Sequence, residues 1–321
     1  MSRQPSRVRI PPRDELVNAF EFEEVARLKL AAAVYSTIAG GDRAAFERLT
    51  FRPRMMVPAH DMDLSVELFG DIHFTPILVG PVAEQQRYHP DGELATMRGA
   101  SAGRAGVIVS SRSSVPIDRI AAEAKTPLWY SVYADGDDNA SVRARQAVAA
   151  GCKAVCVTIG ASLNGGRVTP RPRADWKAID QIRKGLDVPV LIKGVMSAQD
   201  ARTAMEQGAH GIVVSNHGGM ASNTLSTIEV LPSIAEAVAG KVPVLVDGSF
   251  RRNSDIVKAL VFGAKAVLIA RPVMWALAAY GAEGVQTVIE LLQTDVARNM
   301  GALGAPRVKD LTRSMVKMHQ Q

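Results

Sequence analysis

One histidine in this sequence stands among residues that suit it to act as a base. His217 lies in the segment Ser215-Asn-His-Gly-Gly219, directly after a short apolar run. The two glycines that follow it would let the backbone approach a ligand closely. Imidazole has an ordinary pKa of about 6.5, so a neutral histidine can take a proton at physiological pH. We therefore expect His217 to be a general base.

Cationic side chains follow other apolar runs of the same kind. Lys193 ends one run, Arg251 comes shortly after another, and Arg271 follows the last. A lysine in this position could place a positive charge beside an electron-rich cofactor. The two arginines could each make forked, charge-assisted contacts with a phosphate. These residues predict a site for a phosphorylated cofactor near His217.

The elements that must position these residues alternate along the chain. Eight short apolar runs are separated, in most cases, by amphipathic helical segments. The runs cover residues 76–80, 106–110, 128–133, 154–159, 188–193, 211–215, 242–247 and 264–270. Strands that are buried on both faces are typically this short and this uniformly apolar. The pattern predicts an α/β protein with a (β/α)8 TIM barrel. An open doubly wound sheet is the alternative, but no Gly-x-Gly-x-x-Gly follows the first run.

The barrel prediction locates the site. Active sites of such barrels lie at the C-terminal ends of the strands, and a phosphate commonly binds after strands seven and eight. His217 follows the sixth predicted strand, whereas Arg251 and Arg271 follow the seventh and the eighth. All three are therefore expected at one end of the barrel.

Smaller elements precede the barrel. A helix that ends at Gly40-Gly41 and a small strand pair within residues 50–75, closing the barrel's lower end, are expected. The residues expected on the apolar face of that helix are Phe22, Val25, Leu28, Ala32 and Tyr35. We predict an N-terminal arm over residues 1–19, which could be flexible, and a single cofactor-binding domain over residues 20–321.

The composition excludes several classes of protein. Of the 321 residues, 47% are hydrophobic and 22% are charged, which excludes disordered and fibrous chains. No apolar run approaches the roughly 20 residues of a membrane span. The net charge of +6 is spread along a chain with few aromatic residues, so no nucleic-acid partner is expected. Cys152 and Cys156 are too few for a disulfide scaffold and should be buried apolar residues. No metal site is expected.

Together these motifs resemble one family from about residue 20 to residue 315. The chain is similar to the FMN-dependent α-hydroxy-acid oxidases and dehydrogenases, which include glycolate oxidase, lactate oxidase and mandelate dehydrogenase. The segments that carry the resemblance are Phe51-Arg-Pro-Arg54, His89-Pro-Asp-Gly-Glu-Leu-Ala-Thr96, Lys193-Gly-Val195, Ser215-Asn-His-Gly-Gly219 and Asp255 through Arg271-Pro272. The resemblance implies an FMN cofactor and a homotetramer.

The resemblance also implies a role for each matching residue. The flavin ring would pass the backbone of Pro81, Val82 and Ala83. Four side chains would hydrogen-bond its polar edge, namely Ser110, Ser131, Thr158 and Lys193, and the last would also stabilise the negative charge of the reduced flavin. The ribityl chain and the phosphate would be held by Asp247, Gly248, Ser249, Arg251, Ala270 and Arg271. His217 would remove the substrate hydroxyl proton as hydride moves to the flavin. Tyr133 would be an active-site tyrosine, and Arg167 a mobile arginine on the substrate side.

Several substrate-side positions depart from the family pattern. Met220 stands where the family has the arginine that clamps the substrate carboxylate, and Thr37 aligns with a tyrosine that contacts the same group. Gly160 replaces the aspartate that orients the histidine, and Arg112 replaces an aromatic residue. We therefore expect a retained cofactor half and a rebuilt, more open substrate half. Arg112 and Arg167 are candidates for a replacement anion clamp.

The sequence thus predicts a cytoplasmic FMN-dependent oxidoreductase that acts on a small molecule, either a 2-hydroxy acid or a related CH–OH compound. Two alternatives stay open. The same base and flavin could oxidise an amine or a bulkier hydroxy compound, because Met220 and Thr37 cannot replace the family's carboxylate contacts. The chain could also bind FMN without turnover, because Gly160 cannot orient His217 through a side chain.

Overall fold

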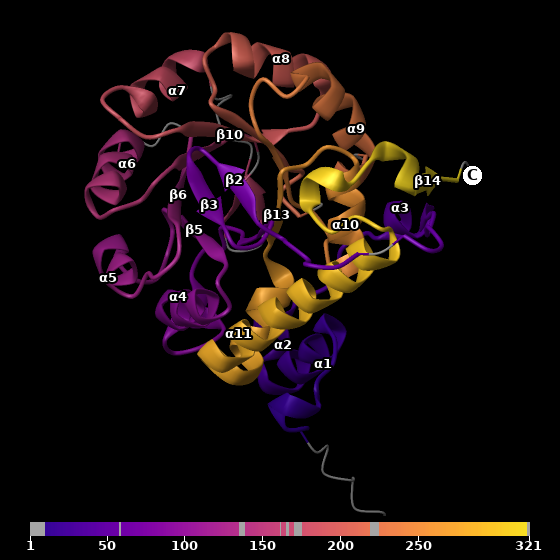
Figure 1. Ribbon diagram of the computed structural model, residues 1–321. Helices are drawn as coiled ribbons and strands as arrows, with labels where there is room; N and C mark the ends of the chain where they lie inside the picture. Colours follow the sequence, from indigo (N-terminus) through magenta and orange to yellow (C-terminus); the bar gives the residue numbers. More distant parts are fainter. Residues whose placement is uncertain are drawn as a thin grey trace, which may run out of the picture.

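The computed structural model describes residues 10–57, 59–134, 139–160, 162–164, 167–169, 175–218 and 225–319. Eight parallel strands close into a barrel in the order in which they occur in the chain (Figure 1). They are β4 (Ile77–Val79), β5 (Gly106–Ser110), β6 (Leu128–Tyr133), β7 (Val155–Thr158), β10 (Val190–Val195), β11 (Gly211–Val214), β12 (Val244–Val246) and β13 (Ala266–Ile269). Seven of these strands fall within their predicted runs, and β10 overlaps its run, 188–193, but continues to Val195. The (β/α)8 prediction is confirmed.

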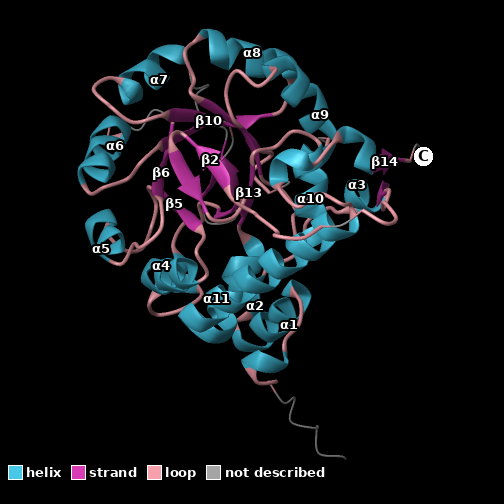
Figure 2. Cartoon of the chain, viewed as in Figure 1, coloured by secondary structure: helices cyan, strands magenta, loops and turns pink. Residues whose placement is uncertain are grey.

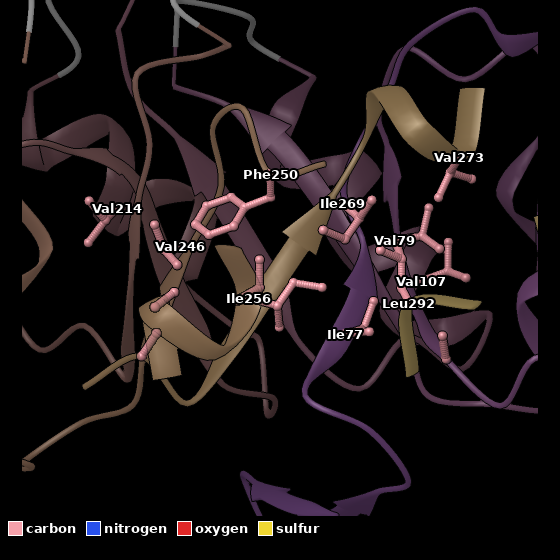
Figure 3. Packing of buried hydrophobic residues seen from close by; sticks show 14 of the residues in the cluster. Ile77, Val79, Val107, Val214, Val246, Phe250, Ile256, Ile269, Val273 and Leu292 are labelled. Atoms are coloured by element: carbon pink, nitrogen blue, oxygen red, sulfur yellow. The ribbon is translucent and has the colours of Figure 1, made fainter. Parts of the chain in front are cut away.

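The uniform apolarity of the strands has a simple cause, because both of their faces are buried. Leu78 points into the barrel, where it packs with Ile108, Trp129 and other inward residues. Its neighbours Ile77 and Val79 belong instead to the layer between strands and helices. Figure 3 shows these two residues of β4 beside apolar side chains of the helical layer.

Helices surround the barrel, as the cyan ring in Figure 2 shows. They are α4 (Gly92–Ala102), α5 (Ile117–Ala122), α6 (Ala140–Ala149), α7 (Trp176–Arg183), α8 (Ala198–Glu206), α9 (Thr227–Val238), α10 (Asn253–Val261) and α11 (Arg271–Ala302). The start of α8 illustrates why they begin where they do, since the Ser197 hydroxyl accepts a hydrogen bond from the Asp200 amide. The long helix α11 is kinked at Tyr280 and Gly281, which have non-helical backbone angles.

The N-terminal helix differs from the prediction. The expected single helix is broken into α1 (Ala19–Lys29) and α2 (Ala32–Tyr35), because Leu30 adopts an extended backbone. Leu28 lies in α1 but is 42% exposed, and Ala32 in α2 is also exposed, so neither is buried with Phe22 and Val25 as predicted. The helical segment α2 also stops before Gly40-Gly41. Of the predicted N-terminal arm, residues 10–19 are described, and Ala19 is the first residue of α1. The Tyr280 hydroxyl donates a hydrogen bond of 2.6 Å to the Pro11 carbonyl.

A short hairpin closes the N-terminal end of the barrel, as predicted for residues 50–75. Strands β2 (Val66–Leu68) and β3 (Asp71–His73) pair antiparallel, and Val66 and Leu68 of β2 join the core inside the barrel. His73 is buried there against Trp129. A second pair, which we did not predict, joins β1 (Leu49–Phe51) to β14 (Val316–Met318) near the C-terminus.

The remaining elements are short. A hairpin after β7 consists of β8 (Ser162–Asn164) and β9 (Arg167–Thr169). The other helical turns are α3 (Ala44–Glu47), η1 (Arg13–Glu15), η2 (Gln85–Arg87), η3 (Val308–Asp310) and η4 (Arg313–Met315). Among the described helices, none is both long and apolar enough to cross a membrane.

The two cysteines are free and buried, as predicted. Burial raises the pKa of both Cys152 and Cys156 to about 12. Their thiols therefore stay protonated at neutral pH and act as small apolar groups.

Candidate active site

A belt of buried polar side chains lies at the C-terminal ends of neighbouring strands. Ser110 of β5 is in register with Ser131 of β6, and the Ser131 hydroxyl lies 3.0 Å from that of Thr158 on β7. Thr158 is in turn in register with Lys193 on β10. All four side chains are almost completely buried. Parallel strands in register place the four predicted ring contacts side by side.

Lys193 is the centre of this belt. Its ammonium group donates hydrogen bonds of 2.6 Å to the Ser215 hydroxyl and 2.6 Å to a carboxylate oxygen of Asp247. The lysine side chain is only 7% exposed, so the opposite charge of Asp247 compensates a cation that burial would otherwise destabilise. The second carboxylate oxygen, Oδ1, is buried and has no hydrogen-bond partner among the described residues. It is therefore an acceptor available to a donor that the chain itself does not provide.

Two arginines converge beside Asp247. Arg251 and Arg271 donate hydrogen bonds of 2.9 Å and 2.7 Å to the same acceptor, the Gly40 carbonyl oxygen. In the described part of the chain, neither guanidinium forms an ion pair. Burial, together with repulsion from Arg271, lowers the pKa of Arg251 to about 9, and burial lowers the pKa of Arg271. Two crowded cations of this kind would be stabilised by an anion with several oxygens, such as a phosphate.

An ion pair between Arg43 and Asp255 holds the loop that carries Arg251. Arg43 contacts the Asp255 carboxylate at 2.8 Å and also donates to the Ser249 carbonyl. Asp255 in turn accepts a hydrogen bond from the Arg251 amide. Gly248 and Ser249 have positive φ values, so this loop turns sharply after β12. No role was predicted for Arg43 or Asp255, although the latter opens one of the motifs that carry the family resemblance.

His217, which follows β11, lies against Ile159, which follows β7. Its Nε2 atom lies 2.7 Å from the Ile159 carbonyl oxygen, and its amide donates to the Ser215 hydroxyl at 3.2 Å. Burial lowers the pKa of His217, and repulsion from Lys193 lowers it further. The imidazole is consequently neutral at physiological pH, the protonation state in which it can accept a proton.

Ser215 lies in the predicted histidine motif, but no role was predicted for it. Its hydroxyl contacts both the Lys193 ammonium and the His217 amide. It therefore connects the cation of the belt to the expected base. The useful signal was its place two residues before a histidine, directly after a strand.

The other predicted cofactor contacts lie on neighbouring loops. Pro81, Val82 and Ala83 follow β4 and are half-buried. The Val82 carbonyl accepts a hydrogen bond from the Gln85 side chain at 3.3 Å. Ala270 follows β13, next to Gly80, whose amide donates to the Ile269 carbonyl. These segments thus lie at the same end of the barrel as the belt, where β13 pairs with β4 and closes the barrel.

The substrate-side residues are only partly described. The Arg112 guanidinium carbon lies 4.2 Å from the centre of the Tyr133 ring, which is a cation–π distance. Arg167 belongs to β9, but its side chain and the whole of Met220 lie outside the described residues. The Thr37 hydroxyl lies 3.0 Å from the Tyr88 hydroxyl. A phenol is therefore present beside the position where the related family has a tyrosine, although it comes from a different segment.

Comparisons with known proteins match most of the chain. The family model described as FMN-dependent dehydrogenase matches residues 31–170 and 166–318. The peroxisomal (S)-2-hydroxyacid oxidase GLO3 of Arabidopsis thaliana is 34% identical, and the match covers 96% of this chain and 98% of the relative. The 4-hydroxymandelate oxidase of Amycolatopsis orientalis is also 34% identical, with 94% and 98% covered. A crystal structure of mandelate oxidase with (S)-2-phenylpropionate superposes with a TM-score of 0.87 at 34% identity, covering 95% of this chain and all of that chain.

Proposed function

Because the chain belongs to the FMN-dependent dehydrogenase family, we propose that it oxidises a 2-hydroxy acid, or a related CH–OH compound, with His217 as the base. One observation carries the proposal. A histidine whose pKa is lowered by burial, a buried lysine, the buried Arg251 and the partly buried Arg271 lie at the C-terminal end of one barrel. That is the end at which barrel enzymes bind their substrates.

The residues of the site fit FMN in two respects. The unpartnered Oδ1 of Asp247 would accept a hydrogen bond from a ribityl hydroxyl group. The crowded guanidinium groups of Arg251 and Arg271 would be neutralised by the phosphate. We further propose that Ser110, Ser131, Thr158 and Lys193 bind the polar edge of the ring, and that the remaining loop contacts are Pro81, Val82, Ala83, Gly248, Ser249 and Ala270.

The first expectation concerns the phosphate contact. Arg271→Ala removes a charge-assisted hydrogen-bond donor, which is worth roughly 1.5–3 kcal/mol, so the Kd of FMN should rise by about 10- to 150-fold. The measurement is a fluorescence titration of the apoprotein with FMN. Arg252→Ala is the matched control, because this neighbouring guanidinium is exposed and lies over the Phe20 ring at 5.3 Å. Equal FMN affinity in the two variants would show that Arg271 does not bind the phosphate.

The roles of the protein groups follow from their charges. FMN, when bound, supplies the acceptor for the hydride. His217 takes the proton of the substrate hydroxyl group, which makes the C–H bond a better hydride donor. Lys193, held by Asp247 and Ser215, would keep a fixed positive charge at the polar edge of the bound ring and would favour negative charge that develops there. We assign Tyr133 and Arg167 to substrate contacts on the open side of the site.

An anaerobic donor screen tests this function. We expect the protein to purify yellow with about one FMN per chain, and a bulky 2-hydroxy acid such as mandelate to bleach the flavin absorbance. The corresponding amine donor, phenylglycine, should leave it unchanged. Bleaching by the amine alone would favour amine oxidation. A flavin that binds but is bleached by no donor would indicate a binding protein without turnover.

Two further expectations do not rest on the geometry of the site, and only the first of them is implied by the family resemblance. We propose a homotetramer and a cytoplasmic location. Light scattering of the FMN-loaded protein tests the first, because a tetramer has four times the mass of the 321-residue chain. Fractionation of the cells that make the protein tests the second.

A further inference from the structure

The contacts of the His217 imidazole indicate how this base is oriented, an inference that rests on the proposed function. We propose that the main-chain carbonyl of Ile159 is the group that positions the catalytic base. In this arrangement it keeps the proton on Nε2 of His217, and Nδ1 is the atom that accepts the substrate proton. A backbone carbonyl thus orients the imidazole, a role that Gly160 cannot fill because it has no side chain.

The hydrogen-bond chemistry determines the tautomer. A carbonyl oxygen can only accept a hydrogen bond, so the nitrogen that lies 2.7 Å from it must carry the proton. A neutral imidazole has a single N–H group. Nδ1 of His217 is then the nitrogen with the free lone pair, and it can act as the base.

The carbonyl itself is fixed in direction. In the peptide just before this carbonyl, the Ile159 amide donates a hydrogen bond of 2.8 Å to the Lys193 carbonyl, so residue 159 continues the pairing of β7 with β10. The register of β10 against β11 shifts between Lys193 and Val195, with Gly194 at the irregularity. The residue whose carbonyl faces His217 is therefore anchored to the barrel through its own amide.

Two glycines make room for the ring. A Cβ atom at Gly160 would lie 2.9 Å from Nε2 of His217, and one at Gly194 would lie 3.1 Å from it. Both glycines have positive φ values, +103° and +113°. A side chain at residue 160 would therefore push the imidazole away from the Ile159 carbonyl. The absence of a side chain is what allows the backbone contact.

The histidine backbone adopts an unfavourable conformation to reach this place. His217 has a φ of +54°, in the left-handed region that few residues other than glycine adopt. The bond from its amide to the Ser215 hydroxyl holds this turn. Strained residues persist where the surrounding structure holds them, and they are concentrated at functional sites.

The test compares two glycine-to-alanine variants of the FMN-loaded protein. Gly160→Ala introduces a methyl group against the imidazole. Gly151 has a similar positive φ, +106°, but an added Cβ atom there would have no neighbouring atom within 4 Å, so Gly151→Ala tests the backbone strain alone. We expect Gly160→Ala to lower the limiting rate of flavin reduction by at least tenfold, with FMN content unchanged. Gly151→Ala should stay within about twofold of the wild type. Equal rates in the two variants would overturn the proposal.

The second measurement does not depend on turnover. In protein labelled with 15N-histidine, the signal lost in His217→Gln identifies this ring, and its long-range 1H–15N pattern reports the tautomer. We expect Nε2–H in the wild type and a loss of that preference in Gly160→Ala. A wild-type ring protonated on Nδ1 would overturn the proposal. If no donor reduces the flavin but the ring is the Nε2–H tautomer, the proposed function fails and the positioning contact stands.

The pH profile gives a third result in the same samples. The carbonyl contact favours the protonated ring and raises the pKa of His217, against the larger opposing effects of burial and of Lys193. Among the described residues, the other charged group that acts on this ring is Asp247, which also raises the pKa. Displacing the ring from the carbonyl should move the acidic limb of the Gly160→Ala profile to lower pH. An unmoved limb, with FMN bound, would count against the contact.

Discussion

Replacing His217 with alanine should slow the reduction of FMN by substrate by about 100-fold to 10,000-fold, the usual range for the loss of a general base. Cofactor binding should be unaffected, since the groups proposed to hold FMN come from other loops. The measurement is anaerobic stopped-flow absorbance at saturating substrate. His60→Ala is the matched control, because His60 is an exposed histidine away from the strand ends. An unchanged limiting rate in His217→Ala would exclude this residue as the base.

The same experiment has a defined pH dependence. Burial and the neighbouring Lys193 lower the pKa of His217 below its ordinary value of about 6.5. Since the base acts when deprotonated, the wild-type rate should rise with pH through that lowered pKa and level off before neutral pH. The acidic limb attributable to this residue should vanish in His217→Ala. A limb that stays in place would belong to another group.

The second large effect concerns small substrates. A carboxylate in a partly dry site needs a charged partner, and a forked arginine is the usual one. Met220 cannot provide such a contact. The lack of an arginine–carboxylate contact should cost on the order of 2–5 kcal/mol of binding free energy, or about 30-fold to several thousand-fold in substrate affinity. We therefore expect glycolate and lactate to be poor substrates of the wild type, and Met220→Arg to improve their turnover.

The control for this gain is Met220→Leu, which changes the side chain without adding charge. The measurement is the rate of anaerobic FMN bleaching by lactate and by glycolate in the three proteins. The gain should be incomplete, since Thr37 and Gly160 also differ from the family pattern. Rapid bleaching of the wild type by micromolar lactate would contradict the expectation. It would mean that another group, with Arg112 and Arg167 as the candidates, already binds the carboxylate.

The fold was readable from the sequence because it depends on short-range patterns. Each barrel strand needs a few consecutive apolar residues, since one side chain enters the barrel and the next faces a helix. Leu78 and Val79 illustrate the two directions. The N-terminal helix was predicted wrongly for the same reason. Spacing alone indicated one face from Phe22 to Tyr35, but the chain turns at Leu30 and Leu28 stays exposed.

The approximate place of the site was also readable, because parallel strands end together. A polar residue directly after an apolar run must lie at the C-terminal end of the barrel. The order of residues alone therefore assigns Lys193 and His217 to one region. Ser110 and Thr158 end their strands in the same way. Ser131 lies inside its strand, and only the structure shows that it is in register with Ser110 and that its hydroxyl lies 3.0 Å from that of Thr158.

By itself, then, the sequence determined the type of barrel, the end that carries the site, the resemblance to FMN-dependent enzymes and the positions that depart from that family. Only the tertiary structure decided which atoms meet. The Ile159 carbonyl contacts an imidazole 58 residues away, and the Gly40 carbonyl accepts from an arginine 231 residues away. Backbone carbonyls have no residue type, so no motif could show that one of them stands where Gly160 lacks a side chain. That contact depends on strand register and on positive φ at glycines, which are properties of the folded chain.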